Sequence, residues 1–246
     1  MKGFLGVYLR ELLLLRKRLL KLVLSFSVNP FLYILAFGIG LGKHLSIMGR
    51  PYLEFLIPGL ISASSMLQAF AINVEINVAR FYLKVFEEFQ SAPLSSISYA
   101  LGEILAGVTR AFLSVFLIIL LAYFLGGVNL HFNGIFFLIV FLNAFIFASL
   151  GLASAMTIKS HADQTLITNL IITPMMFLGG TFFPVENLPP LIKPIIEILP
   201  LTLVSKTLRA ISWGQFFSYR DLFILSLIAI FCFIVSILTI KRANED

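Results

Sequence analysis

Long apolar runs separated by short polar segments fill most of the chain and predict six membrane-spanning helices. A helix needs roughly 20 apolar residues to cross the hydrocarbon core of a bilayer, and each run has about that length. The first, fourth and fifth runs carry no charged residue. The predicted spans are residues 22–41, 52–76, 104–125, 134–158, 165–183 and 222–240.

Composition leads to the same fold class, an all-α integral membrane protein with a single transmembrane domain over residues 1–246. The chain is 59% hydrophobic and 12% charged, with a mean hydropathy of +1.01, whereas soluble domains are roughly 25% charged. A soluble fold of this size could not bury so much apolar surface. The first apolar run is too long for the core of a signal peptide and has no small-residue cleavage site, so we expect it to remain as a membrane helix.

The distribution of Lys and Arg predicts the orientation of the chain. With six spans, eleven basic residues fall on the side of the two termini and six on the opposite side. Because basic residues collect in cytoplasmic loops, both termini are expected in the cytoplasm of a multi-pass protein of the cell membrane. The net charge of +6 therefore reflects topology, and we expect no nucleic-acid partner.

Residues 2–18 form a separate amphipathic segment ahead of the first span. Arg10, Lys17 and Lys21 share one helical stripe, with leucines around the rest. This pattern suits a helix that lies in the headgroup plane of the membrane. A simple positively charged anchor for the first span explains the pattern equally well.

The loop between the second and third spans predicts a short amphipathic helix within residues 81–93. Its apolar face holds Tyr82, Val85, Phe86 and Phe89, and its polar face holds Lys84, Glu87 and Glu88. Pro93 should stop this helix, and Ser95 or Ser96 should cap the next one. The helix either rests on lipid or docks into a groove on a partner protein.

The segment between the fifth and sixth spans, residues 184–211, is apolar and rich in proline. A helix over 188–199 is about 18 Å long at 1.5 Å per residue and is too short to cross the bilayer. We expect this helix to be bent at one proline and ended at another, followed by a second short helix over 201–211. The segment is therefore predicted to be a re-entrant hairpin at the outer surface; its key positions are Pro184, Asn187 as a helix cap, Pro189, Pro190, Pro194 as the bend and Pro200 as the end.

Charged residues inside predicted spans cost roughly 2.5–3.5 kcal/mol each on insertion scales, so they usually face protein or water. Arg110 lies roughly eleven residues into its helix. Its expected neighbours are near Gln68 on the second span, or Glu103 on the same face of its own helix. Two roles explain Arg110 in this position: a structural bridge between helices, or a contact with substrate.

Motifs of catalysis and of metal or nucleotide binding are missing from the sequence. The stretch GIGLGKH at 38–44 lacks the four-residue spacing and the Ser or Thr of a phosphate-binding loop, and its GxxxG element favours close helix packing. The single cysteine, Cys232, excludes a disulfide or a thiolate metal site within one chain. We expect neither a catalytic residue nor a metal site on this chain, and therefore no enzyme.

Three stretches in a fixed order carry a resemblance to a known family. They are YLEFLIPGLI at the start of the second span, SSISYALGE after the cytoplasmic helix, and FLGGTFFPVENLPPLIKPIIEILPLT after the fifth span. With six spans, this order resembles the membrane subunit of type-2 ATP-binding-cassette exporters, and most closely the permeases for drugs, lipo-oligosaccharides and polysaccharides. The resemblance covers nearly the whole chain.

The resemblance implies an interface helix at 2–18, a coupling helix within 81–93 and an outer gate at 184–211. Family members work as two permeases with two ATPase subunits, so it also implies a second copy of this chain and two copies of a separate ATPase. The chain has no nucleotide-binding motif, so ATP and Mg are expected on that partner and no cofactor on this chain. The implied substrates are a lipid-linked glycan, a polysaccharide or a hydrophobic drug.

A pathway between two copies would be lined by spans one, two and five. The polar side chains that we expect near it are Asn29, Tyr33, Gln68, Asn73, Thr168, Asn169 and Thr173. Hydrogen bonds between helices explain these residues as well. Two other functions are weighed against an exporter subunit: a secondary transporter, for which inverted repeats are missing, and a membrane-embedded lipid-modifying enzyme, for which clustered acids or histidines are missing.

Overall fold

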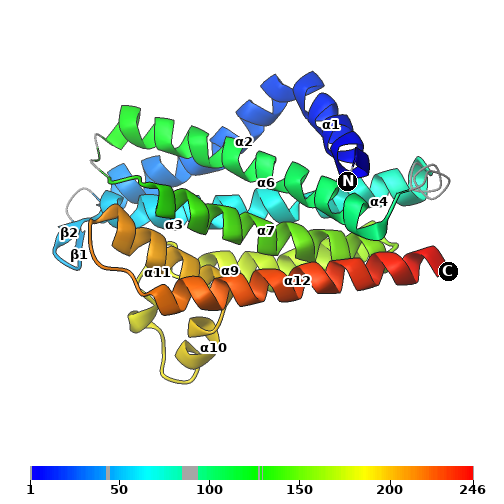
Figure 1. Cartoon of the computed structure of the whole chain (residues 1–246). Coiled ribbons are helices and arrows are strands. Elements are labelled where there is room, and N and C mark those ends of the chain that lie inside the picture. Colours follow the sequence, from blue (N-terminus) through cyan, green and yellow to red (C-terminus); the bar gives the residue numbers. More distant parts are fainter. Residues whose placement is uncertain (1, 43–44, 85–93, 127, 129, 246) are drawn as a thin grey trace.

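The chain folds into a bundle of long helices that run along a common direction (Figure 1). The computed structural model describes residues 2–42, 45–84, 94–126, 128 and 130–245. The first half contains α1 (Lys2–Lys17), α2 (Leu19–Tyr33), β1 (Ser46–Ile47), β2 (Arg50–Pro51), α3 (Tyr52–Phe70), α4 (Ile72–Asn77) and α6 (Ser96–Leu121). The second half contains α7 (Gly134–Thr157), α8 (His161–Ile167), α9 (Thr173–Leu178), α10 (Lys193–Glu197), α11 (Pro200–Ser212) and α12 (Tyr219–Glu245).

Within the residues that the structure describes, five helices are long and apolar enough to cross a membrane. They are Leu19–Leu41, Tyr52–Tyr82, Ser96–Leu125, Gly134–Thr157 and Tyr219–Ala243, and they correspond to predicted spans one, two, three, four and six. The multi-pass helical membrane fold is therefore confirmed. The predicted fifth span, 165–183, coincides in part with a helical run from α8 through a π-helical segment (Thr168–Ile172) to α9. This run begins with the polar residues His161, Asp163 and Gln164, which lower its hydropathy, and it is not among the five.

Several long helices end in π-helical turns. Such turns follow α2 (Ile34–Leu41), α4 (Val78–Tyr82) and α6 (Ala122–Gly126). The third long helix begins eight residues earlier than the predicted span, at Ser96, because Ser95 caps it: its Oγ accepts a hydrogen bond from the amide of Ser98 at 3.2 Å. The predicted serine cap is thus confirmed.

The second span, made of α3, α4 and the π-helical turn after it, is the central helix of the bundle. In its most apolar window 83% of the residues are buried, compared with 22% for the first span and 28% for the last. Glycines let its neighbours approach closely. A Cβ added to Gly151 on α7 would lie 2.7 Å from the carbonyl oxygen of Phe70, and one added to Gly107 on α6 would lie 3.2 Å from the carbonyl oxygen of Ala69.

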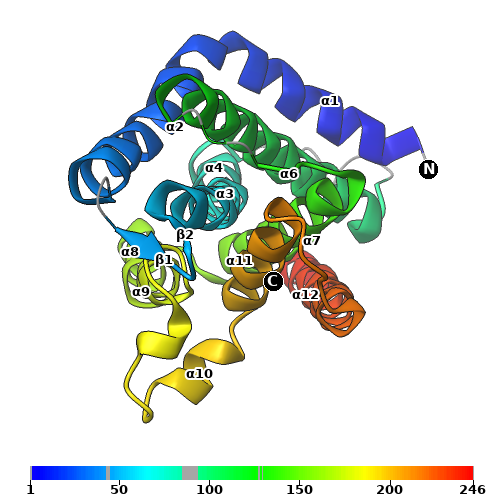
Figure 2. The ribbon, with the colours of Figure 1, turned by 90° about the vertical axis from the view of Figure 1, so that its left-hand side faces the viewer.

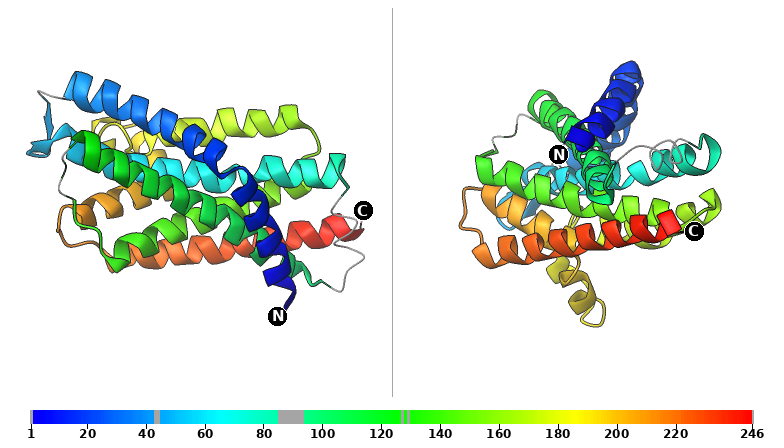
Figure 3. Two further views of the ribbon diagram at one scale, coloured as in Figure 1. Left: turned by 90° about the horizontal axis from the view of Figure 1, so that it is seen from above. Right: turned by 45° about the vertical axis from the view of Figure 1, so that its right-hand side comes forward.

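The first helix, α1, crosses the bundle at an angle instead of joining it. It packs on α6 at the end where both termini lie (Figures 1 and 3), and its Val7 is buried against Gly102. A break at Arg18 (φ −113°, ψ 10°) separates α1 from α2. The predicted helix over 2–18 is therefore present, and one face of it is bound to protein.

The proline-rich segment differs from its prediction. A helix over 188–199 was expected, but the structure has a 3₁₀ turn at Val185–Asn187, then turns, and a helix of only five residues, α10. Asn187 caps no helix, Pro194 lies at the start of α10 instead of bending it, and Pro200 begins α11 instead of ending a helix. The reason is that proline suits the first turn of a helix, where its missing N–H would have no partner, far better than the interior. In Figure 2, α10 projects away from the bundle.

A matched pair of glycine substitutions tests the packing of the central helix. Gly151→Ala should lower the free energy of unfolding by roughly 1–3 kcal/mol, because the new methyl group meets backbone and not a movable side chain. Gly6→Ala on α1, where a Cβ would meet nothing within 4 Å, should be neutral or raise stability by up to about 1 kcal/mol. Thermal unfolding in detergent measures both. Equal effects of the two substitutions would contradict this account of the α3–α7 contact.

Candidate functional site

A cavity between α2, α3 and α9 brings together four of the seven predicted pathway residues. It has a volume of about 130 Å³, and its lining includes Asn29, Tyr33, Gln68 and Thr173, together with Ser64. Amide and hydroxyl groups from three helices therefore face one space, whose remaining wall is apolar apart from Ser25. Such a mixture can accept a ligand that carries both hydroxyl groups and apolar surface.

The other three predicted pathway residues lie elsewhere. Asn73 is 1% exposed, and its Nδ2 has no hydrogen-bond partner among the described residues. Thr168 donates a hydrogen bond from Oγ1 to the carbonyl of Gln164 at 3.0 Å. Asn169 is exposed. Sequence reasoning could not separate these residues from the cavity group because helical rotation at π-helical turns differs from the regular 3.6-residue period.

The helices on both sides of the cavity expose apolar side chains. On α2 these include Leu24, Val28 and Leu32, and on the α8–α9 run they include Leu166 and Leu170, each at least half exposed. In the end view of Figure 2, α2 and the α8–α9 run flank α3 on one side of the bundle, away from α12. The cavity thus lies on a face of the chain that other parts of the same chain leave uncovered.

A cluster of aromatic rings packs beside Tyr33, one of the residues that line the cavity. The ring of Phe182, from the turn after α9, lies 5.2 Å from that of Tyr33 and 5.3 Å from that of Phe37, measured between centroids. The ring of Phe177 stacks on Phe182 at 5.2 Å. These spacings are typical of favourable aromatic pairs.

The turn that carries Phe182 is held by side chains from α3 and α11. Tyr52 donates a hydrogen bond from its hydroxyl to the carbonyl of Phe182 at 2.7 Å, and Ser205 donates one to the carbonyl of Gly179, also at 2.7 Å. Arg209 is 8% exposed; its guanidinium donates to the carbonyl of Gly180 at 2.6 Å and lies over the ring of Phe55 at 3.7 Å. Each free carbonyl of an irregular turn inside the protein thus gains a donor.

A proline inside α3 leaves one more backbone carbonyl without its helical hydrogen-bond donor, and Trp213 supplies a donor instead. Pro58 has no N–H, so the carbonyl of Glu54, four residues earlier, loses its helical partner. The indole Nε1 of Trp213 donates to that carbonyl at 3.2 Å. The guanidinium of Arg50, which pairs with Glu54 at 3.0 Å, lies 5.2 Å from the centroid of the Trp213 ring. Sequence analysis missed Arg209 and Trp213 as anchors of this end.

Of the predicted outer-gate residues, the structure brings only Pro184 into this anchored region. Pro184 is buried next to Val185, whereas Asn187, Pro189, Pro190 and Pro194 are exposed and Pro200 is half-buried. The gating role of these residues stays a prediction.

The buried arginine in the third span pairs with a residue that was not expected. Arg110 forms an ion pair with Glu75 on α4, and its guanidinium also lies 5.8 Å from the ring of Phe26. Among the described residues, Arg110 pairs with neither Gln68 nor Glu103. Glu75 is two helical turns beyond Gln68 on the same helix, so the prediction identified the correct span and the wrong depth.

At the end of the bundle where the termini lie, the second span is tied to the connection between α7 and α8. Asn77 donates from Nδ2 to the carbonyl of Ile158 at 2.7 Å, Arg80 donates to the carbonyl of Met156, and Tyr82 stacks on His161 at 5.0 Å. Tyr82 thus belongs to the last turn of the second span. The other predicted coupling residues, Val85, Phe86, Glu87, Glu88, Phe89 and Pro93, lie outside the described residues.

The described residues hold no group of three or more His, Cys, Asp or Glu side chains that could bind a metal ion. What they offer is a small polar cavity, a set of exposed apolar helices beside it, and two ends at which helices are joined by hydrogen bonds. These features can bind and move a ligand.

Comparisons with known proteins agree with this picture. Residues 4–213 match the family described as ABC-2 type transporter. The inner membrane transport permease YadH of Escherichia coli K12 is 26% identical over 175 residues, covering 71% of this chain and 68% of that protein. Nodulation protein J of Rhizobium leguminosarum bv. viciae is 28% identical over 217 residues, covering 87% and 83%, and that of Rhizobium meliloti is 28% identical over 218 residues, covering 87% and 82%.

A double-mutant cycle tests the role of the Trp213 hydrogen bond. Trp213→Phe should lower the free energy of unfolding by about 1–3 kcal/mol, because it leaves the carbonyl of Glu54 without a donor. In a Pro58→Ala background the backbone N–H of residue 58 can satisfy that carbonyl, so the same substitution should cost less. Unfolding of the four proteins in detergent gives the coupling free energy. A coupling of zero would mean that Trp213 contributes only through packing.

Proposed function

The chain belongs to the ABC-2 type transporter family and is therefore a membrane subunit of an ABC transporter, and we propose that two copies of it form the pathway of an exporter. The family implies partnership with an ABC ATPase. We infer that this ATPase is a separate polypeptide, present in two copies, which binds ATP and Mg.

The observation that carries the proposal is the cavity at Asn29, Tyr33, Gln68 and Thr173, which opens on a face with uncovered apolar helices. A second copy placed against α2 and the α8–α9 run would cover those helices. It would also join two such cavities into one continuous space. This arrangement accounts for both the polar lining and the apolar flanks, which hydrogen bonds between helices of one chain do not.

The ties at the two ends of the bundle support a mechanism. In our proposal the segment 81–93 rests on the ATPase at the cytoplasmic side, where both termini also lie, and α1 lies along the membrane surface. When ATP binding draws the two ATPases together, the movement passes to the end of the second span and, through Asn77 and Tyr82, to the start of α8. The second span and α8–α9 carry two walls of the cavity, so their displacement would change its width.

The far end of the pathway is proposed to open at the turn that carries Phe182. The segment 184–211 follows this turn and would act as an outer gate, bent so that it does not cross the bilayer. The substrates that fit a cavity with amide, hydroxyl and aromatic groups are a lipid-linked glycan, a polysaccharide or a hydrophobic drug. Membrane lipid surrounds the remaining apolar surface.

The partner proposal predicts what is purified with the chain. A tagged chain extracted from its native membrane in mild detergent should carry a separate ATP-binding-cassette ATPase, and the chain alone should not hydrolyse ATP. Phe86→Ala combined with Phe89→Ala should weaken the association, because buried aromatic anchors often contribute about 2 kcal/mol or more to an interface. Phe216→Ala, an exposed aromatic at the opposite end, serves as the control. ATP hydrolysis by the isolated chain would exclude the proposal.

The pathway proposal predicts the effect of filling the cavity. Ser64→Trp places a large ring in the space between α2, α3 and α9, so export should fall by about tenfold or more while the complex still assembles and hydrolyses ATP. Ile230→Trp is the matched control, because Ile230 is 57% exposed on α12, far from the cavity. Export and ATP hydrolysis are measured in vesicles. Normal export by the Ser64 variant would place the pathway elsewhere.

A further inference from the structure

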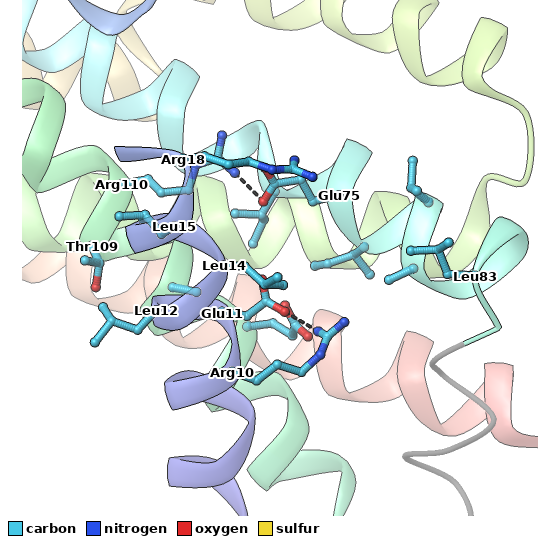
Figure 4. A pocket seen from close by; sticks show the side chains of 16 residues that line it. Arg10, Glu11, Leu12, Leu14, Leu15, Arg18, Glu75, Leu83, Thr109 and Arg110 are labelled. Atoms are coloured by element: carbon cyan, nitrogen blue, oxygen red, sulfur yellow. Dashed lines mark hydrogen bonds and ion pairs between the residues drawn. The ribbon is translucent and has the colours of Figure 1, made fainter. Parts of the chain in front are cut away.

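A second cavity lies at the end of the bundle that holds the termini, and the proposed pathway does not use it. Its volume is about 210 Å³, and it is enclosed by α1, the second span and α6 (Figure 4). Part of its wall is apolar and includes Leu12, Leu15 and Leu83. The rest carries six charges: Arg10, Arg18, Arg110, Glu11, Glu75 and Glu103.

Four of these charges neutralise one another in pairs. Arg10 pairs with Glu11 within α1, and Arg110 on α6 pairs with Glu75 on α4. No ion pair formed within the described part of the chain includes Arg18 or Glu103. The cavity is therefore left with one guanidinium, that of Arg18, and one carboxyl group, that of Glu103, which form no ion pair.

The two remaining charges lie at different depths. Glu103 is only 4% exposed, on the α6 side of the cavity, and its hydrogen-bond partner is the hydroxyl of Tyr99. Arg18 is exposed, at the break between α1 and α2, and forms part of the rim (Figure 4). An ammonium group placed beside Glu103 would supply the close ion-pair partner that this buried carboxyl group does not have in the chain, so the inner wall favours a ligand with a positive group. The buried Nε of Arg110, which has no hydrogen-bond partner in the described structure, offers one further donor.

A site for a cation at depth and a site for an anion at the rim match a zwitterion with a terminal ammonium group. We propose that this cavity binds the headgroup of a phosphatidylethanolamine-type phospholipid, with the primary ammonium at Glu103 and the phosphate at Arg18. The ammonium is the outermost group of this headgroup, so it reaches the inner wall first, and guanidinium is well suited to phosphate. The amphipathic helix α1 forms one wall of the cavity, and such helices lie at the depth of lipid headgroups.

The chemistry also predicts selectivity among lipids. The ammonium of phosphatidylethanolamine donates hydrogen bonds to a carboxylate, whereas the trimethylammonium of phosphatidylcholine has no N–H and is larger. Glu103 should therefore distinguish the two headgroups, and Arg18, which meets the shared phosphate, should not.

Lipid binding to the whole purified chain in detergent tests the proposal, with native mass spectrometry as the readout. The chain is titrated with dioleoyl phosphatidylethanolamine, its N-monomethyl and N,N-dimethyl forms, and phosphatidylcholine. Affinity should fall stepwise along this series, by about tenfold in total. Equal binding of the first and last lipids would overturn the proposal without any substitution, so the test does not depend on a variant that folds.

Substitutions then assign the two charges. Glu103→Gln should abolish the preference for ethanolamine, with Glu54→Gln, a carboxylate at the other end of the bundle, as the control. Arg18→Gln should weaken all four lipids alike, with Lys17→Gln, which does not line the cavity, as the control. A folded Glu103→Gln protein that keeps the preference would contradict the proposal. So would soluble glycerophosphoethanolamine that binds as tightly as the lipid, because the ligand would then be a soluble amine.

Discussion

In hydrocarbon, a backbone carbonyl or amide without a hydrogen-bond partner costs several kcal/mol, and this constraint governs where the helices of the chain can be interrupted. Pro58 frees the carbonyl of Glu54 inside the second span, and the turn after α9 frees three more. Side chains that are distant in sequence supply the donors: Trp213, Tyr52, Ser205 and Arg209. The interruptions therefore lie where α3 and α11 meet, inside the protein and away from lipid. Each irregular point is also a tertiary connection.

These connections determine which parts of the bundle can move together. The turn after α9 is bonded to α3 and α11, and its Phe182 packs on Tyr33 and Phe37 of the first span. At the other end, the last turn of the second span is bonded to the connection between α7 and α8. The α8–α9 run otherwise exposes much of its surface. A helix that is fixed at its two ends and free along its length can bow or tilt without breaking either attachment, which suits a wall of a pathway.

Much of this architecture follows from periodicity and composition, because long apolar runs can form only helices in a bilayer. Five predicted spans are present, and the cap at Ser95 was identified from its residue type.

The errors have local causes. A helix over 188–199 was predicted from its apolar content, but Pro194 suits the first turn of a helix far better than its interior, so the helix begins at Lys193 and has only five residues. The partner of Arg110 was placed too near Gln68, because sequence gives the neighbouring helix but not the relative depth of two helices. Asn29, Tyr33, Gln68 and Thr173 are four of seven residues predicted near a pathway, and only these four line one cavity. The anchors Arg209 and Trp213 were missed, since an arginine in an amphipathic segment looks the same whether it faces water or a carbonyl.

The position of Arg110 shows how a span can keep a charge at moderate cost. Charges at the centre of a bilayer are expensive unless they meet protein or water, and Arg110 meets both a carboxylate on α4 and the polar cavity beneath α1. Because α1 packs on the first turns of α6, that part of α6 faces protein instead of lipid. Arg110 therefore lies beside polar groups and not in hydrocarbon. The amphipathic helix thus acts as more than an anchor. It allows six charged side chains to gather beside the spans, and the pairing of four of them leaves the inner wall negative and the rim positive. A site with this polarity at headgroup depth would select a lipid by its ammonium group, independently of a substrate in the proposed pathway at Gln68 and Thr173.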